Sequence, residues 1–145
     1  MAQFDQTNDQ VLGYQGTAIE VSLPSDTVAD TDLNYLDSVE LDSTTGYITT
    51  ATGADASKYL GIVADSGGIE SGYSGRIIRG VRVKKELVGS CSIGDLLEAT
   101  DETTVTALTT TLGSYLAPIN SFGIALEDQT TGNMVDMLVD PKILV

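Results

Sequence analysis

The sequence contains no histidine, no tryptophan and a single cysteine, Cys91. Without histidine the chain cannot build the Ser-His or Cys-His pairs of nucleophilic enzymes, or a zinc or haem site with histidine ligands. One cysteine excludes an internal disulfide and a metal site made of several thiolates. The absence of tryptophan, with aromatic residues at 6%, disfavours a stacking surface for sugars or bases. These absences leave mainly structural and binding roles.

Positive charge is also scarce. The chain has 7 Lys and Arg against 21 Asp and Glu, a net charge of −14. Such a surface repels nucleic-acid phosphates and anionic lipids, so we expect neither nucleic acid nor a membrane as partner. Residues 1–10 lack the basic and apolar regions of a signal peptide, and no apolar run approaches the ~20 residues of a membrane span.

The order of the residues is typical of an all-β fold. Val, Ile and Thr recur, and turn residues interrupt them about every ten residues. The sequence predicts a compact β-barrel or β-sandwich of short antiparallel strands. Residues 1–15 are predicted to form an extended N-terminal arm, and residues 16–145 a single β domain, a size that can bury its own core.

Alternating apolar positions and turn residues locate the individual strands. We expect hairpins at 39–51 and 96–108, a long acidic loop at 24–37 and a glycine-rich loop at 66–75. Pro141 has no amide proton to donate and is expected to end the last strand. The predicted strands cover residues 16–23, 39–42, 47–51, 59–64, 76–83, 96–99, 105–108, 122–126 and 134–139.

Residues 37–65 and 95–128 resemble each other as an internal repeat. Each segment predicts a hairpin followed by a returning strand, with the sequence Leu60-Gly-Ile in the first and Phe122-Gly-Ile in the second. Two such units could face each other across one core. A chance match between two β segments is the alternative.

The acidic loop contains candidate calcium ligands. Asp30, Asp32 and Asn34 match the start of an EF-hand loop, in which oxygen ligands alternate along the chain. Tyr35, however, stands where the sharp turn needs glycine, and Leu41 stands where a bidentate glutamate is needed. An irregular cation site and a solvated acidic loop both stay open. We predict no catalytic residue, no cofactor and no metal ligand.

Basic residues are concentrated in one stretch. Five of the seven basic residues lie between residues 76 and 85. In a strand, Arg82 and Lys84 project from one face, with Arg79 near its start. These side chains could pair with carboxylates of their own chain or guard a strand edge. They could also dock on an acidic partner or an identical subunit.

The predicted arm carries apolar side chains in a polar setting, enough to dock on a partner and too few to fold alone. They complete the predicted partner-binding set, which consists of Phe4, Val11, Leu12, Tyr14, Arg79, Arg82 and Lys84.

Several short motifs follow one another over residues 38–140. They are Gly80-Val-Arg-Val, Ser92-Ile-Gly-Asp-Leu-Leu, Val105-Thr-Ala, Phe122-Gly-Ile-Ala-Leu-Glu and Val135-Asp-Met-Leu-Val. This order of strands and turns resembles the small capsid-decoration proteins of tailed viruses, also called head-stabilising or cement proteins.

The resemblance implies a compact β fold that is usually trimeric and sits on the outer capsid surface of the virion. There it would bind the major capsid protein, bridge neighbouring capsid subunits and resist internal DNA pressure, without catalysis or a cofactor. A cell-surface or extracellular β-type binding module, calcium-dependent or not, is the alternative function.

Overall fold

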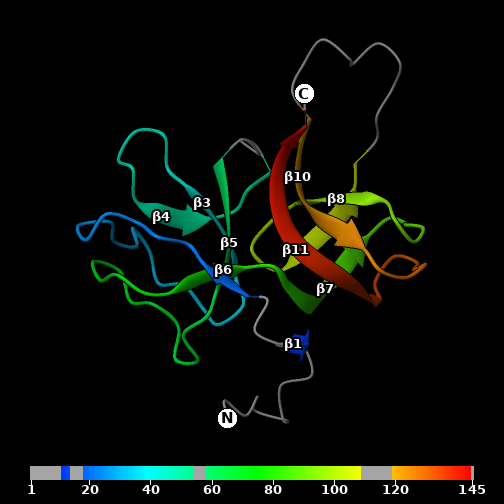
Figure 1. The fold of residues 1–145 in the computed structure, drawn as a ribbon, viewed down its shortest axis with the longest axis horizontal. Coiled ribbons are helices and arrows are strands. Elements are labelled where there is room, and N and C mark those ends of the chain that lie inside the picture. Colours follow the sequence, from blue (N-terminus) through cyan, green and yellow to red (C-terminus); the bar gives the residue numbers. More distant parts are fainter. Residues whose placement is uncertain (1–10, 14–17, 54–57, 109–118, 145) are drawn as a thin grey trace.

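The computed structural model describes residues 11–13, 18–53, 58–108 and 119–144, and this part contains β-strands and no α-helix (Figure 1). The predicted all-β class is confirmed. No helix of the described part could cross a membrane. The strands are β1 (Val11–Gly13), β2 (Ile19–Glu20), β3 (Ser38–Leu41), β4 (Ile48–Thr50), β5 (Tyr59–Val63), β6 (Ile77–Arg79), β7 (Val81–Val88), β8 (Leu96–Ala99), β9 (Thr104–Ala107), β10 (Ile119–Ala125) and β11 (Met134–Leu144).

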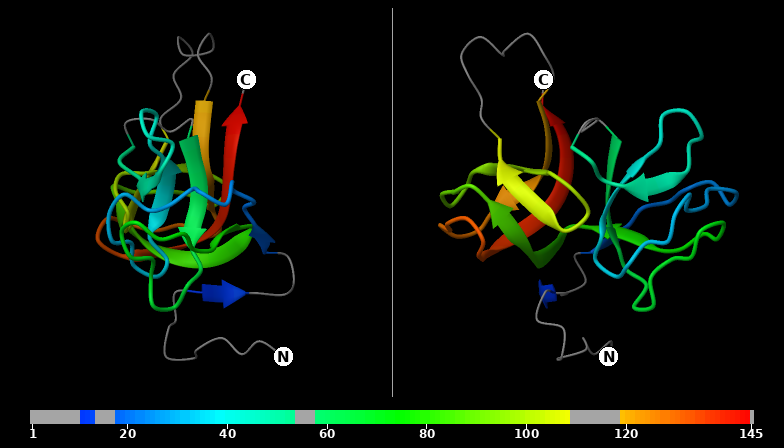
Figure 2. Two further views of the ribbon diagram at one scale, coloured as in Figure 1. Left: turned by 90° about the vertical axis from the view of Figure 1, so that its left-hand side faces the viewer. Right: turned by 180° about the vertical axis from the view of Figure 1, so that it is seen from behind.

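The strands form two sheets that lie side by side (Figures 1 and 2). One sheet has the order β1-β7-β11-β10-β8-β9, and β9 also pairs with β7, so β7 to β11 form a closed ring. The other has the order β2-β6-β5-β3-β4. The β7–β9 pair is parallel, which differs from the predicted antiparallel pairing throughout. The compact fold thus joins a ring of strands to an open sheet.

Both sheets repeat one arrangement of strands. Strand for strand, the order β2-β6-β5-β3-β4 in one sheet corresponds to the order β7-β11-β10-β8-β9 in the other. The second strand of each hairpin, β4 or β9, ends its list. Ala29 and Ile48 form a parallel bridge in the position where Leu87 and Val105 pair in parallel between β7 and β9. We call residues 18–79 the first unit and residues 81–144 the second unit.

The repeat extends to the turns before β3 and β8. The Asp37 carboxylate accepts a hydrogen bond from the backbone amide of Asn34 at 2.8 Å. In the second unit, the Asp95 carboxylate accepts one from the amide of Ser92, also at 2.8 Å. A carboxylate that binds an amide three residues earlier fixes the same tight turn in both units.

One backbone position in this turn distinguishes the two units. Gly94 has a φ of 89°, and Leu36, in the equivalent place, has a φ of 68°. A leucine in this conformation is strained because its Cβ crowds the backbone. Leu36 is only 3% exposed and packs in the core. Burial of its side chain therefore offsets the strain of its backbone.

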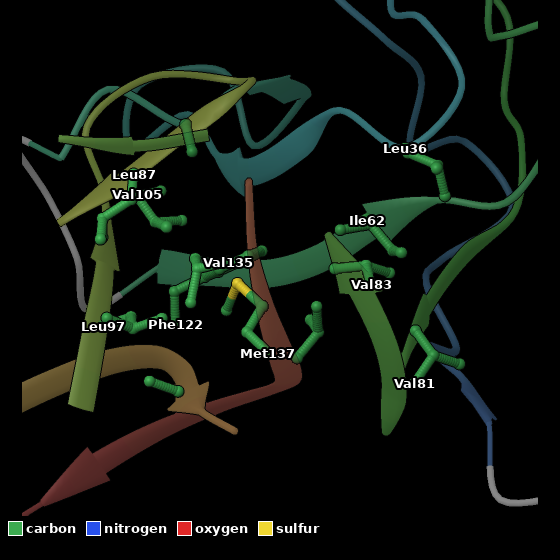
Figure 3. Close-up of a cluster of buried hydrophobic side chains, with 14 of the residues drawn as sticks. Leu36, Ile62, Val81, Val83, Leu87, Leu97, Val105, Phe122, Val135 and Met137 are labelled. Atoms are coloured by element: carbon green, nitrogen blue, oxygen red, sulfur yellow. The ribbon is translucent and has the colours of Figure 1, made fainter. Parts of the chain in front are cut away.

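The largest apolar cluster takes side chains from both units (Figure 3). Tyr59 of the first unit packs edge-on against Phe122 of the second, with ring centroids 5.3 Å apart. The Tyr59 hydroxyl also accepts from the Ala99 amide at 3.1 Å and donates to the Ala99 carbonyl at 3.2 Å. This cluster therefore packs the two units against each other, while the first unit has a second buried cluster of its own, around Val39, Ile48 and Val63. The shared cluster contains Leu36, Ala51, Ile62 and Ile78 together with Val81, Val83, Leu87, Cys91, Leu97, Ala99, Val105, Phe122, Ala125, Val135, Met137 and Val139.

The strand predicted at 76–83 is divided. Gly80, with a φ of 78°, separates β6 from β7, so the chain passes there from the first unit to the second. Glycine adopts this conformation without the clash that other residues suffer. The prediction of a single strand over residues 76–83 is wrong, because the backbone turns at Gly80 and Arg79 is exposed where an unbroken alternation with Val81 and Val83 would bury it.

The prediction that Pro141 ends the last strand is wrong. β11 continues through Pro141 to Leu144 and stays paired with β10. β10 contributes Phe122 where β11 contributes both Asp140 and Pro141, which is a β-bulge. The extra residue of a bulge is left out of the ladder, so a proline is tolerated there.

The N-terminal third differs most from the prediction. The strand expected at 16–23 is limited to β2 among the described residues, and the acidic loop buries Ala29, Leu33 and Leu36. Of the predicted arm, the structure describes β1, which pairs antiparallel with β7. Residues 1–10 and the arm residues after β1 lie outside the described residues.

Substitutions at two equivalent glycines, Gly61 and Gly123, test how closely the neighbouring strands of each unit must approach. A Cβ at Gly61 would collide with the Ile78 carbonyl of β6, and a Cβ at Gly123 with the Leu138 carbonyl of β11. We expect Gly61→Ala and Gly123→Ala each to lower the free energy of unfolding by about 2–3 kcal/mol in urea titrations. Gly67→Ala, in open space, is the control and should change it by less than about 0.5 kcal/mol.

Candidate functional site

The basic stretch lies on β6, β7 and the residue before β6. Along β7 the side chains alternate between buried and outward positions, with Arg82 and Lys84 outward and Lys85 inward. Arg79, at the end of β6, is exposed. The five clustered basic residues therefore do not form one stripe, because one of them turns into the protein.

Arg82 pairs with a carboxylate of its own chain. Its guanidinium lies 2.6 Å from the Asp136 carboxylate on the neighbouring strand β11. This hydrogen bond and the attraction between the charges raise the pKa of Arg82. The Asp136 amide in turn donates to the Glu127 carboxylate at 3.0 Å. Of the two interpretations of the basic residues, internal pairing holds for Arg82.

The other outward basic residues differ in their partners. Arg76 lies 3.5 Å from Glu20, with both side chains more than half exposed, so this pair adds little stability. Arg79 and Lys84 form no ion pair with any residue that the structure describes. Arg79 and Lys84 are therefore the charges of this stretch that stay available to a partner.

Lys85 lies at the junction of the two units. It is 4% exposed, and its Nζ donates to the Leu36 carbonyl at 2.5 Å and to the Glu102 carbonyl at 2.9 Å. The Glu102 carbonyl also accepts from the Ser38 amide at 2.8 Å. The ammonium group thus joins the backbone of the first unit to that of the second.

Burial dominates the electrostatics of this junction. It lowers the pKa of Lys85 to about 8, although the carboxylates of Asp37, Asp101 and Glu102 favour the charged form. Burial also raises the pKa of Asp37, against the effects of its hydrogen bond from Asn34 and the charge of Lys85. Sequence reasoning missed this role, although Lys85 shares its strand face with Val83 and Leu87.

The predicted arm residues meet the basic stretch on β7. Val11 lies opposite Val83, and Gly13 opposite Arg82. Val11 and Leu12 are placed by their backbone in β1, and their side chains lie outside the described residues. Phe4 and Tyr14 lie outside them altogether.

The candidate calcium ligands of the acidic loop hold the glycine-rich loop in place. The Asp32 carboxylate accepts from the Ser71 amide at 2.9 Å, and the Asp30 carbonyl accepts from the Ser71 hydroxyl at 3.0 Å. Over the described ranges, no group of three or more Cys, Asp and Glu side chains is arranged to hold a metal ion.

The junction makes a prediction about pH. The pKa of Lys85 is about 8 in the folded protein and 10.5 without burial, so between these pH values the unfolded chain binds a proton that the folded chain does not. Stability from this group therefore rises with pH. The free energy of unfolding of the wild type, relative to that of Lys85→Met, should rise by on the order of 3 kcal/mol from pH 8 to pH 10.5.

Urea titrations at closely spaced pH values measure this difference. Lys84→Met, which changes the outward neighbour, is the matched control and should follow the wild type. A constant difference between wild type and Lys85→Met across this range would contradict a buried, charged junction.

Comparisons with known proteins establish no family. No protein-family model matches the chain, and no curated protein sequence matches it. A solved structure, the N base of head fiber gp8.5 of bacteriophage phi29, is similar with a TM-score of 0.49 and 14% identity. The similarity covers 88% of this chain and 98% of that one. A likeness of this size establishes neither a common fold nor a common function.

Proposed function

We propose that this protein is a structural protein of a tailed-virus particle that decorates the outer capsid surface. It stabilises the capsid by bridging neighbouring copies of the major capsid protein, and it does so as a homotrimer. The role is one of attachment and reinforcement, with no catalysis, no cofactor, and neither nucleic acid nor a membrane as partner. The motif order over residues 38–140, which resembles capsid-decoration proteins, supports this proposal.

The single observation that carries the bridging role is that two units with the same strand order pack against each other and are joined by hydrogen bonds. A bridge between capsid subunits must transmit force from one contact to the other, so a flexible linker between its halves would weaken it. Here the two units pack against each other through one apolar cluster and are joined by Lys85, and the Ser38 amide donates to the Glu102 carbonyl. One chain can therefore present a surface of each unit to the capsid.

Charge supports a specific mode of attachment. With a net charge of −14 the protein is repelled by acidic surfaces over most of its area. The exposed Arg79 and the partly exposed Lys84 are exceptions, since they have no ion-pair partner in the described part of the chain. These two charges would orient the protein on an acidic patch of the capsid.

The proposal is tested on capsids of the virus that encodes this chain, assembled without it. Added protein should co-sediment with the capsids to saturation and raise the temperature at which they release DNA. Light scattering of the free protein should give the mass of three chains. Capsids that bind no protein would refute the proposed function. A protein that binds only as a monomer would refute the proposed trimer.

Reversing the two available charges should weaken attachment without unfolding the protein. We expect Arg79→Glu with Lys84→Glu to lower capsid occupancy several-fold, and wild-type binding to weaken as salt rises. Arg82→Gln is the control: it removes a pair internal to the chain, costs up to about 1 kcal/mol of stability and leaves occupancy unchanged. Equal occupancy of the double variant and the wild type would exclude a docking role for both residues.

A further inference from the structure

The repeat shows which strand edges of the two units are equivalent. In the first unit, Glu20 of β2 lies opposite Ile78 of β6. In the second unit, Arg82 of β7 lies opposite Leu138 of β11. Because β6 and β11 hold the same place in their sheets, Glu20 corresponds to Arg82, and the outer edge of β2 corresponds to the outer edge of β7.

These two equivalent edges differ in what lies on them. The edge of β7 holds β1, which pairs antiparallel with Val11 opposite Val83 and Gly13 opposite Arg82. On β2, by contrast, β6 is the neighbour, and no strand of the described residues occupies the other edge (Figure 2). Among the residues that the structure describes, the first unit therefore has an open edge where the second unit has a filled one.

The backbone of β2 is oriented to accept a strand. The Val21 amide donates to the Ile77 carbonyl of β6 at 2.8 Å. Backbone groups alternate between the two sides of a strand, so the amide and carbonyl of Glu20 face the open edge. Ile19 is 55% exposed, whereas Val81, its equivalent, is fully buried. An open edge beside an exposed aliphatic side chain is a site for strand addition.

Charge indicates what kind of segment would bind. Ile19 lies opposite Arg79, which is exposed, and Arg76 keeps 54% of its side chain exposed despite its pair with Glu20. A strand whose carboxylates lie on the face of Ile19 and Arg79, away from the Glu20 carboxylate, would match the Arg79 guanidinium group. The strand that fills the equivalent edge, Val11–Gly13, carries no basic side chain, and the sequence just before it contains Asp5 and Asp9 and no Lys or Arg.

We propose that the outer edge of β2 is an acceptor site for an extended acidic segment of a partner protein, which adds as an antiparallel strand beside Glu20 as β1 does beside Arg82. The inference rests on the proposed function only for the source of the segment, which is then the major capsid protein. Binding at this edge would repeat a strand pairing that the second unit already contains, between β1 and β7.

Two substitutions at Glu20 separate the contribution of its backbone amide from that of its side chain. Glu20→Pro removes the amide proton that faces the open edge and leaves the pairing with β6 intact, since proline is tolerated on edge strands. It also removes the ion pair with Arg76. Glu20→Ala removes the same ion pair and keeps the amide proton, so it is the matched control. Thermal melts verify that both full-length variants are folded.

The binding probe is a synthetic peptide with residues 5–16 of this chain, followed by amide chemical shifts of the full-length protein. Saturable shifts at residues 19–21 are expected in the wild type and in Glu20→Ala, with binding to Glu20→Pro about tenfold weaker or more. No binding to the wild type, equal binding to Glu20→Pro, or shifts confined to residues 81–83 would each overturn the proposal.

Hydrogen exchange of the Glu20 amide separates the other possible occupants. In the free protein this amide should exchange rapidly and become protected when the peptide binds. Protection at every concentration would mean that the chain's own N-terminal residues cover the edge. Protection that appears as concentration rises would mean that a second copy covers it. Either result overturns a partner site.

The capsid assay distinguishes this inference from the proposed function. Peptide binding without capsid binding leaves the acceptor edge standing and refutes the function. Normal occupancy by Glu20→Pro leaves the function standing and overturns the assignment of the edge to the capsid.

Discussion

The contact on which the rest of the structure depends is the buried ammonium group of Lys85 between the two units. A buried charge is costly unless hydrogen bonds replace the water that it loses. Here two backbone carbonyls, from Leu36 and Glu102, replace part of that water, and burial still lowers the pKa of Lys85 to about 8. The Leu36 carbonyl reaches Lys85 from a backbone turned to positive φ, and that turn is held by the Asp37 carboxylate. The strain, the turn and the buried cation therefore depend on one another.

The two units show how one strand arrangement serves two positions. In the second unit, one face of β7 packs in the apolar cluster that both units contribute to. The outer edge of β7 pairs with β1 and with β9. In the first unit, β2 has only two residues and turns Ile19 to solvent. The same order of strands therefore leaves an edge without a neighbouring strand in the described part of the first unit and fills the equivalent edge in the second.

The few positive charges are used in distinct ways. Lys85 is buried at the junction, while Arg82 and Arg76 pair with carboxylates of the same chain. Arg79 and Lys84 remain outward and without an ion-pair partner among the described residues. On a protein with a net charge of −14, such isolated charges orient an encounter more than they strengthen it.

Sequence alone determined the all-β class and both central hairpins, because strand alternation and turn residues are local signals, and it indicated a repeat over residues 37–65 and 95–128 with a chance match as the alternative. Tertiary structure alone decided the break at Gly80, the bulge that carries β11 past Pro141, and the fate of each basic residue. Lys84 and Lys85 are neighbours in a row of charges, yet one faces outward and the other faces two carbonyls. That choice depends on which face of β7 the other unit covers, and contacts between residues far apart in the sequence determine it.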